Sequence, residues 1–149
     1  MTYYYRHLTS FDVLLLKELL SVFGEAFAEP ETYQGKVPGD AYLESLLGKE
    51  HFIVLVAQDG ERIVGGLAAY VLEKFEQERK EIYIYDLAVL EEHRRRGIAT
   101  GLIHDLRQIG KSKDAYVIFV QADKVDTAAI KLYESLGTRE EVYHFDIQV

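Results

Sequence analysis

The fold is decided by residues 81 to 104, which read Glu-Ile-Tyr-Ile-Tyr-Asp-Leu-Ala-Val-Leu-Glu-Glu-His-Arg-Arg-Arg-Gly-Ile-Ala-Thr-Gly-Leu-Ile-His. The segment 81–89 is rich in β-branched and aromatic side chains and predicts a central strand. From Arg96 to about Gly110, apolar side chains recur at helical spacing and predict a helix. The order is therefore strand, basic turn, helix.

This turn predicts an anion site. The first turn of a helix has backbone N–H groups without partners inside the helix, and the aligned peptide dipoles place partial positive charge there. Arg94, Arg95 and Arg96 add charge that does not titrate near neutral pH. Gly97 lets the backbone approach a bulky ligand, and Ala99 nearly does the same. Arginines at a helix start also suit a solvated cap or salt bridges, but the preceding strand favours a phosphate site.

The composition predicts a single domain over residues 1–149. A chain of 149 residues with 48% hydrophobic and 28% charged residues is large enough to bury a core. The absence of cysteine excludes disulfides, thiolate metal sites and a cysteine-linked acyl intermediate, and it suits a reducing cytosol. There is no signal-like N-terminus and no window that approaches a membrane span, so we expect a cytoplasmic protein without a membrane partner.

The charge distribution predicts two different ligands. A formal net charge of −8 disfavours nucleic acid, which requires a basic face. The basic cluster sits in one turn, whereas acidic side chains crowd the last quarter of the chain, which suggests an anion at one place and a cation at the other. The histidines are scattered without the spacing of metal ligands, so no metal is expected.

Outside the central segment, periodicity predicts an α/β (α+β) fold, with a mixed central sheet and about four helices. Before residue 81 we expect a strand over 2–8, a helix capped by Ser10 and ending near Gly24, an irregular segment over 25–39, a helix over 40–47, and strands over 51–58 and 62–72. Asp59-Gly60 predicts a hairpin, and Gly65-Gly66 a bulge or a close backbone approach. After the helix we expect a buried strand over 115–121 parallel to the central one, a helix over 127–136, and a final strand over 141–149.

The segment 25–39 is a candidate binding loop, because long loops in compact domains often bind ligands. Its aromatic and acidic side chains are candidates to line an acceptor site: Phe27, Tyr33, Glu25, Glu29 and Glu31. The alternative is a surface connector.

Two motifs resemble the GNAT superfamily of N-acetyltransferases. Arg94-x-x-Gly97-x-Ala99 resembles the Arg/Gln-x-x-Gly-x-Gly/Ala signature, whose loop grips the pyrophosphate of acetyl-coenzyme A in that family. Asp126-x-x-Ala129-x-x-Leu132-Tyr133-x-x-Leu136-Gly137 resembles a second pattern, with aspartate where asparagine is usual. The resemblance implies the GNAT fold, with the strands at 81–89 and 115–121 splayed apart, and acetyl-coenzyme A as cofactor. The implied cofactor-binding residues are Leu87, Ala88, Val89, Arg94, Arg95, Arg96, Gly97, Ile98, Ala99, Thr100, Asp126 and Ala129.

Within that superfamily, the runs at 70–77, 82–89, 115–123 and 139–147 resemble the aminoglycoside 3-N-acetyltransferases. This resemblance implies acetylation of the 3-amino group of the 2-deoxystreptamine ring, resistance to gentamicin-type antibiotics, and a homodimer. The same chemistry on a polyamine or a protein amine, and a non-catalytic acyl-coenzyme A sensor, are the alternatives.

Amine acetylation needs a neutral nucleophile, and alkylammonium groups titrate near about 10. Asp86 is the candidate base, with a bulge-anchoring or sheet-edge acid as the alternative reading. Tyr133, at the position where the family commonly uses a tyrosine, is the candidate acid toward the leaving thiolate, with hydrogen bonding alone as the alternative. The predicted substrate-binding residues are Tyr33, Asp123, Glu140, Glu141 and Asp146, because a polycationic aminosugar requires several carboxylates. Without cysteine, direct transfer in a ternary complex is favoured.

Overall fold

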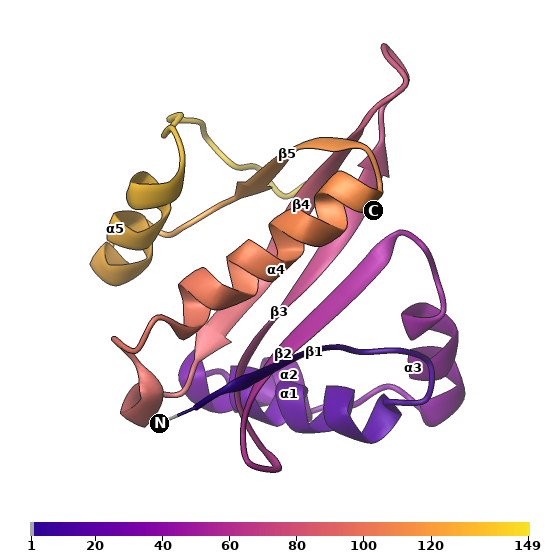
Figure 1. Ribbon diagram of the computed structural model, residues 1–149, viewed down its shortest axis with the longest axis vertical. Coiled ribbons are helices and arrows are strands. Elements are labelled where there is room, and N and C mark those ends of the chain that lie inside the picture. Colours follow the sequence, from indigo (N-terminus) through magenta and orange to yellow (C-terminus); the bar gives the residue numbers. More distant parts are fainter. Residues whose placement is uncertain (1) are drawn as a thin grey trace.

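A computed structural model describes residues 2–149 and shows a five-stranded mixed sheet with helices on both faces (Figure 1). In chain order the elements are β1 (Tyr4–His7), α1 (Val13–Ala26), α2 (Pro30–Gln34), α3 (Asp40–Leu47), β2 (Phe52–Asp59), β3 (Arg62–Glu73), β4 (Lys80–Val89), the 3₁₀ turn η1 (Glu91–His93), α4 (Ile98–Ser112), β5 (Ala115–Val120) and α5 (Thr127–Leu136). Among the helices of this described part, none combines the length and the apolar composition needed to cross a bilayer.

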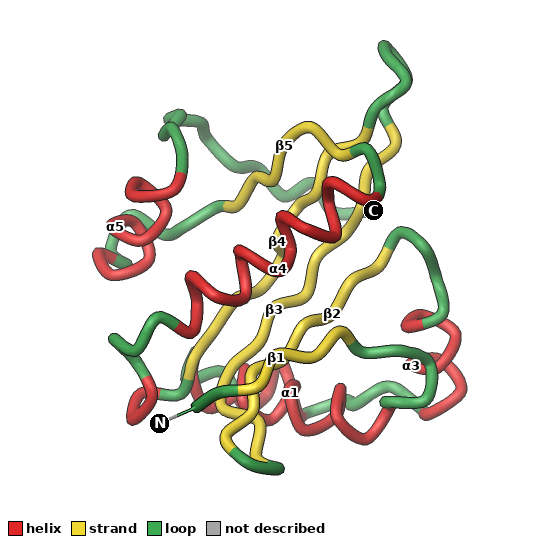
Figure 2. The backbone as a smooth tube through the Cα atoms, viewed as in Figure 1, coloured by secondary structure: helices red, strands yellow, loops and turns green. Residues whose placement is uncertain are grey.

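The strands lie in the order β1-β2-β3-β4-β5, and only the pairing of β4 with β5 is parallel. The predicted hairpin joins β2 to β3, with Gly60 at a φ of 62°. Pairing between β4 and β5 ends at Ile84 and Val120, although β4 continues to Val89. Figure 2 shows the two strands diverging beyond that point. The predicted splay is therefore present, and the end of β4 has a neighbour on one side only.

Two hydrophobic cores cover the two faces of the sheet. Leu102 and Leu106 of α4 are fully buried against one face, together with Ile82 and Ile84 of β4. The other face packs against α1 and α3, where Leu19 of α1 is fully buried. Because the apolar residues of α4 recur at helical spacing, a single stripe of that helix is enough to cover its face.

A β-bulge interrupts β4 next to the splay. The register with β3 leaves Tyr85 without a partner. Ile84 before the bulge and Leu87 after it both pack into the core under α4, so two residues rather than one lie between them. Tyr85 and Asp86 therefore both project from the opposite face, toward α1 and α2.

The N-terminal third differs from the sequence prediction in two places. The residue that precedes α1 is Asp12 instead of Ser10; it is buried, accepting hydrogen bonds from Arg6 at 2.7 Å and from the Thr9 amide at 2.8 Å. The helix also continues to Ala26. The segment predicted to be irregular contains α2, so residues 2–149 hold five α-helices rather than about four. Aromatic contacts with α1 stabilise α2, which local propensity did not reveal.

The C-terminal third differs more from the sequence prediction. The strand predicted over 141–149 is not formed, and residues 138–149 have no regular secondary structure. Tyr143, Phe145 and Ile147 are 86%, 81% and 87% exposed. β5 is parallel as predicted but not buried, since it is the edge strand and Tyr116 and Phe119 are 49% and 36% exposed. Alternation predicts which residues suit a strand, but a strand also needs a partner for its backbone.

Gly66 provides a test of the packing between α1 and the sheet. A Cβ at this position would lie 2.6 Å from Leu19 Cδ1 and 2.7 Å from the Leu55 carbonyl oxygen, so the predicted close approach is present. We expect Gly66→Ala to lower the free energy of unfolding by about 1 to 3 kcal/mol, because neighbouring atoms must move. Urea unfolding measures this change.

The matched control is Gly48→Ala at the end of α3, where φ is −79° and a Cβ would make only ordinary contacts at 3.6 Å. This variant should keep the wild-type stability or gain up to about 1 kcal/mol. Equal losses in the two variants would contradict the packing shown here.

Candidate active site

The start of α4 has the geometry of an anion site. Gly97 precedes the helix with a φ of 78°, a left-handed conformation that glycine adopts without strain. The Gly101 amide donates to the Gly97 carbonyl at 2.9 Å, so the amides of Ile98, Ala99 and Thr100 precede the hydrogen-bond ladder of the helix. A Cβ at Gly97 would meet no protein atom within 4 Å. The backbone conformation therefore favours glycine, and the space in front of Gly97 is open.

The three arginines of the turn have different environments. Arg94 Nε donates to the Val89 carbonyl at 3.0 Å and ties the turn to the end of β4. An Arg96 guanidinium nitrogen donates to the Tyr3 hydroxyl at 3.3 Å. Arg95 is exposed and has a φ of 63°. Arg94 and Arg96 thus shape the turn, whereas Arg95 is an exposed cation two residues before Gly97.

The edge of β4 beside this turn has unpaired backbone groups. Leu87, Ala88 and Val89 pair with β3 on one side and have no β5 partner on the other, because the parallel pairing stops at Ile84. An extended ligand with amide groups binds such an edge as an added strand does. This edge and the open helix start together fit acetyl-coenzyme A, which has an amide-containing arm and a pyrophosphate.

Asp86 is a partly buried carboxyl group that bonds to α2. The Tyr33 hydroxyl donates to Asp86 Oδ1 at 3.1 Å. Burial raises the pKa of Asp86, the hydrogen bond from Tyr33 opposes this rise, and the charge of Glu29 adds to it. Burial and the same carboxylate raise the pKa of Tyr33, so its hydroxyl stays protonated as a donor. Asp86 therefore holds a proton more strongly than an ordinary aspartate, which suits a base.

Tyr133 lies on α5 and packs partly buried against the core under α4. Burial, followed by the charge of Asp126, raises the pKa of Tyr133 to about 12. Asp126 itself caps α5, accepting a hydrogen bond from the Ala129 amide at 3.1 Å. The aspartate in this motif thus has a clear structural role, since aspartate and asparagine are both good helix caps.

The structure does not bring the predicted acidic residues to Asp86. Asp123, Glu140, Glu141 and Asp146 are all exposed. Glu141 pairs with Arg139 at 3.5 Å and Asp146 with His144 at 2.8 Å. The groups that shift the pKa of Asp86 are Tyr33 and Glu29. Of the predicted substrate-binding residues, Tyr33 is the one that contacts the candidate base.

Aromatic residues that were not predicted as site residues lie beside Asp86. The ring of Tyr85, the bulged residue, lies 6.0 Å from that of Tyr70 and 5.8 Å from that of Tyr83. The sequence does contain a signal for this arrangement: the large apolar residues that pack under α4 fall on even positions up to Ile84 and on odd positions, Leu87 and Val89, after it. That change of phase marks the bulge.

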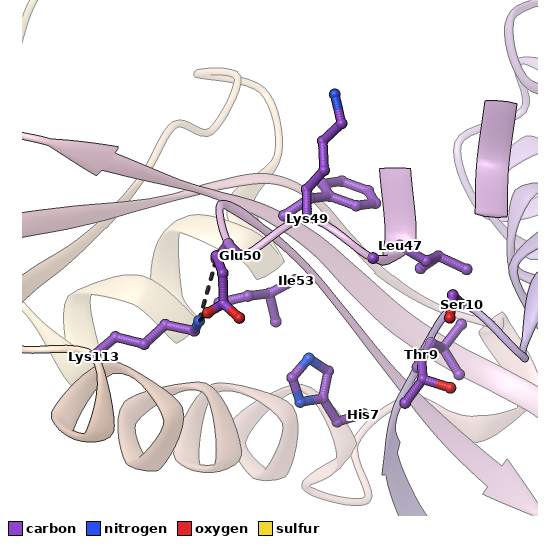
Figure 3. A pocket seen from close by; sticks show the side chains of 11 residues that line it. His7, Thr9, Ser10, Leu47, Lys49, Glu50, Ile53 and Lys113 are labelled. Carbon is purple, nitrogen blue, oxygen red and sulfur yellow. Dashed lines mark hydrogen bonds and ion pairs between the residues drawn. The ribbon is translucent and has the colours of Figure 1, made fainter. Parts of the chain in front are cut away.

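A separate hollow of about 230 Å³ lies beside β1 and the start of β2 (Figure 3). Lys113 Nζ and Glu50 Oε2 are 2.9 Å apart there, and the nearby Lys113 contributes, after burial, to a lowered pKa of His7. None of the candidate catalytic or cofactor-binding residues lines this hollow. The candidate active site is therefore distinct from this hollow and lies at the splayed end of β4.

Residues 16–138 match the acetyltransferase (GNAT) family, and the chain belongs to this family. Acetyl-coenzyme A is the cofactor of the family.

Individual relatives agree with this assignment. The chain is 56% identical to an aminoglycoside acetyltransferase, HMB0005, from an uncultured soil metagenomic sample, with 100% and 99% of the two chains covered and a TM-score of 0.98. A second such enzyme, meta-AAC0020, solved in complex with sisomicin, is 35% identical, with 99% and 96% covered and a TM-score of 0.90. N-acetyltransferase 8B of Rattus norvegicus is 27% identical over 90 residues, which are 60% of this chain and 40% of that protein. The chain thus spans less than half the length of the curated relatives that it matches.

The bond between Tyr33 and Asp86 can be tested directly. In Tyr33→Phe the charged carboxylate loses a donor, so the pKa of Asp86 should rise above its wild-type value. Titration of the aspartate side-chain carbons by NMR measures it. Tyr42→Phe is the control, because Tyr42 is 65% exposed on the neighbouring α3 and its hydroxyl is not a donor to Asp86. An unchanged or lower pKa in Tyr33→Phe would contradict this contact.

Proposed function

We propose that this protein transfers the acetyl group of acetyl-coenzyme A to the 3-amino group of the 2-deoxystreptamine ring of an aminoglycoside, and so confers antibiotic resistance. The observation that carries the acceptor class is the 56% identity, over the whole chain, to an aminoglycoside acetyltransferase. The 3-position rests on the resemblance of the runs at 82–89, 115–123 and 139–147 to the 3-N-acetyltransferases.

The cofactor is held at two places in this proposal. The amides of Ile98, Ala99 and Thr100, with Arg95, hold the pyrophosphate, and Arg94 and Arg96 keep the turn in shape. The free edge of Leu87, Ala88 and Val89 pairs with the extended arm. The remaining implied residues, Gly97, Asp126 and Ala129, fix the backbone at the starts of α4 and α5. When bound, acetyl-coenzyme A supplies an activated acetyl carbonyl and a sulfur leaving group.

Asp86 removes a proton from the acceptor ammonium, directly or through a water molecule. An alkylammonium with a pKa of about 10 is almost wholly charged at neutral pH, so a base is needed. The raised pKa of Asp86 increases its proton affinity. The rate constant kcat/KM should therefore increase as pH rises through the pKa of Asp86, because only the ionised carboxylate accepts a proton.

Tyr133 donates a hydrogen bond to the sulfur as negative charge develops there. Its pKa of about 12 keeps the hydroxyl protonated. A thiol has a pKa of about 8.5, below that of Tyr133, so complete transfer of the phenolic proton to sulfur is unfavourable. Because of this difference, Tyr133 donates a hydrogen bond to the sulfur and keeps its proton, and solvent supplies the proton that the sulfur takes up. With no cysteine in the chain, attack is direct, within a ternary complex.

The experiment that tests this proposal offers gentamicin, kanamycin and spermidine with acetyl-coenzyme A and measures coenzyme A release. We expect release with the two aminoglycosides and, by NMR of the product, acetylation at the 3-amino group. Release with spermidine alone would favour the polyamine alternative, which requires the same acidic surroundings. No release with any amine would favour a sensor of acyl-coenzyme A.

Tyr133→Phe tests the role of Tyr133 in catalysis. It should lower kcat about 10- to 100-fold with little change in KM, since the lost hydrogen bond forms mainly in the transition state. Tyr143→Phe removes a hydroxyl from an 86% exposed residue and should leave kcat unchanged. Equal effects of the two substitutions would remove Tyr133 from the mechanism.

We also propose a cytoplasmic homodimer formed through residues 138–149. This segment alternates apolar and polar side chains and is exposed, and β5 offers an open edge. Sedimentation velocity should give a dimer for the full chain and a monomer after removal of residues 138–149. A full-length monomer at micromolar concentration would contradict this arrangement.

A further inference from the structure

We infer that Tyr85 and the aromatic rings beside it form a stacking site for the ring of a cationic amine, next to Asp86. This inference rests on the proposed function and names the part of the acceptor that this surface recognises: a saturated ring that carries ammonium groups.

The rings form a continuous row across three strands. Tyr70 on β3 meets Tyr85 on β4 edge-on at 6.0 Å, and Tyr85 meets Tyr83 edge-on at 5.8 Å. Tyr83 stacks on Phe119 of β5 at 4.7 Å with an interplanar angle of 4°. The row therefore presents both ring faces and hydroxyl edges along the sheet.

The row is braced at Tyr70 and at Tyr83, on either side of Tyr85, so the rings are held in place before a ligand binds. Phe52 packs against Tyr70 with ring centroids 5.1 Å apart. The Tyr83 hydroxyl donates to Gln121 Oε1 at 3.3 Å. A fixed surface loses little conformational freedom on binding. Tyr85, in the middle, is 63% exposed, so a ligand can reach its ring.

The charges around the row fit a cation. Asp86 follows Tyr85 in the chain, and Glu29 is near enough to Asp86 to raise its pKa. Tyrosine ring faces carry partial negative charge and attract ammonium groups. A ring that bears ammonium groups can use the aromatic surface and the carboxylates together. A linear polyamine can reach the carboxylates but has no ring to place on Tyr85.

The bulge explains why stacking and chemistry coincide. In a regular strand, consecutive side chains point to opposite faces, so Tyr85 and Asp86 would be separated by the sheet. The extra residue places both on one face. A ring seated on Tyr85 therefore holds its amino group beside the carboxylate that takes the proton.

The test compares ring-bearing and linear amines on Tyr85 variants. In the full-length protein without acetyl donor, calorimetry should show kanamycin binding to Tyr85→Ala about 10-fold more weakly than to the wild type, a loss of about 1.4 kcal/mol. Spermidine affinity should change less than about twofold. Tyr85→Phe keeps the ring and should bind kanamycin as the wild type does. Tyr85→Leu keeps apolar bulk without a π face and should lose affinity, which provides a second variant if the alanine variant unfolds.

Phe75→Ala is the matched control, since Phe75 is a 99% exposed aromatic residue in the turn between β3 and β4. It should leave both affinities unchanged. Binding is measured without acetyl donor. The stacking site can therefore be tested even if the protein acetylates no amine. Equal loss of kanamycin and spermidine affinity in Tyr85→Ala would overturn the inference. So would conversion of a dimer to a monomer by Tyr85→Ala, which would assign the row to the interface with a second copy.

Discussion

The site depends on one feature of the sheet: β4 has a neighbour on both sides up to Ile84 and on one side beyond it. Backbone groups in a sheet interior are already paired, so only a strand that loses a neighbour can offer them to a ligand. The same divergence places the end of β4 directly before the turn that starts α4. A free strand edge and a set of free helix amides thus lie in succession along the chain.

The electrostatics of Asp86 result from a balance of opposed effects. Burial and Glu29 favour the protonated carboxyl, whereas the Tyr33 hydroxyl favours the carboxylate. Each pKa unit corresponds to about 1.4 kcal/mol between the two forms, so the loss of a single hydrogen bond can change the pKa of Asp86 measurably. Tyr33 is itself held by ring contacts with Phe23 and Phe27 at 5.8 and 5.7 Å. The position of α2 therefore affects the pKa of Asp86 on β4.

The parts of the fold that local sequence specifies were predicted, and those that need a partner were not. The helix over 127–136, the Asp59-Gly60 hairpin and the strand leading into the basic turn follow from periodicity and turn residues. The exposure of β5 and the unpaired segment 138–149 depend on what lies beside them, which alternation does not reveal. Within the site, the link between Tyr33 and Asp86 spans 53 positions and has no local signal. The bulge did have one, in the change of apolar phase after Ile84.

Burial also explains how a carboxylate can deprotonate an ammonium whose pKa in water is several units higher. A low-dielectric site disfavours every charged form, so it raises the pKa of a carboxyl and lowers that of an ammonium. An acceptor seated beside Asp86 excludes water from both groups at once, and their proton affinities approach each other. The raised pKa of Asp86 in the free protein already brings the pKa of the carboxyl closer to that of the ammonium. Mutual attraction between the carboxylate and the ammonium opposes this convergence, so the partial burial of the base has to outweigh that attraction.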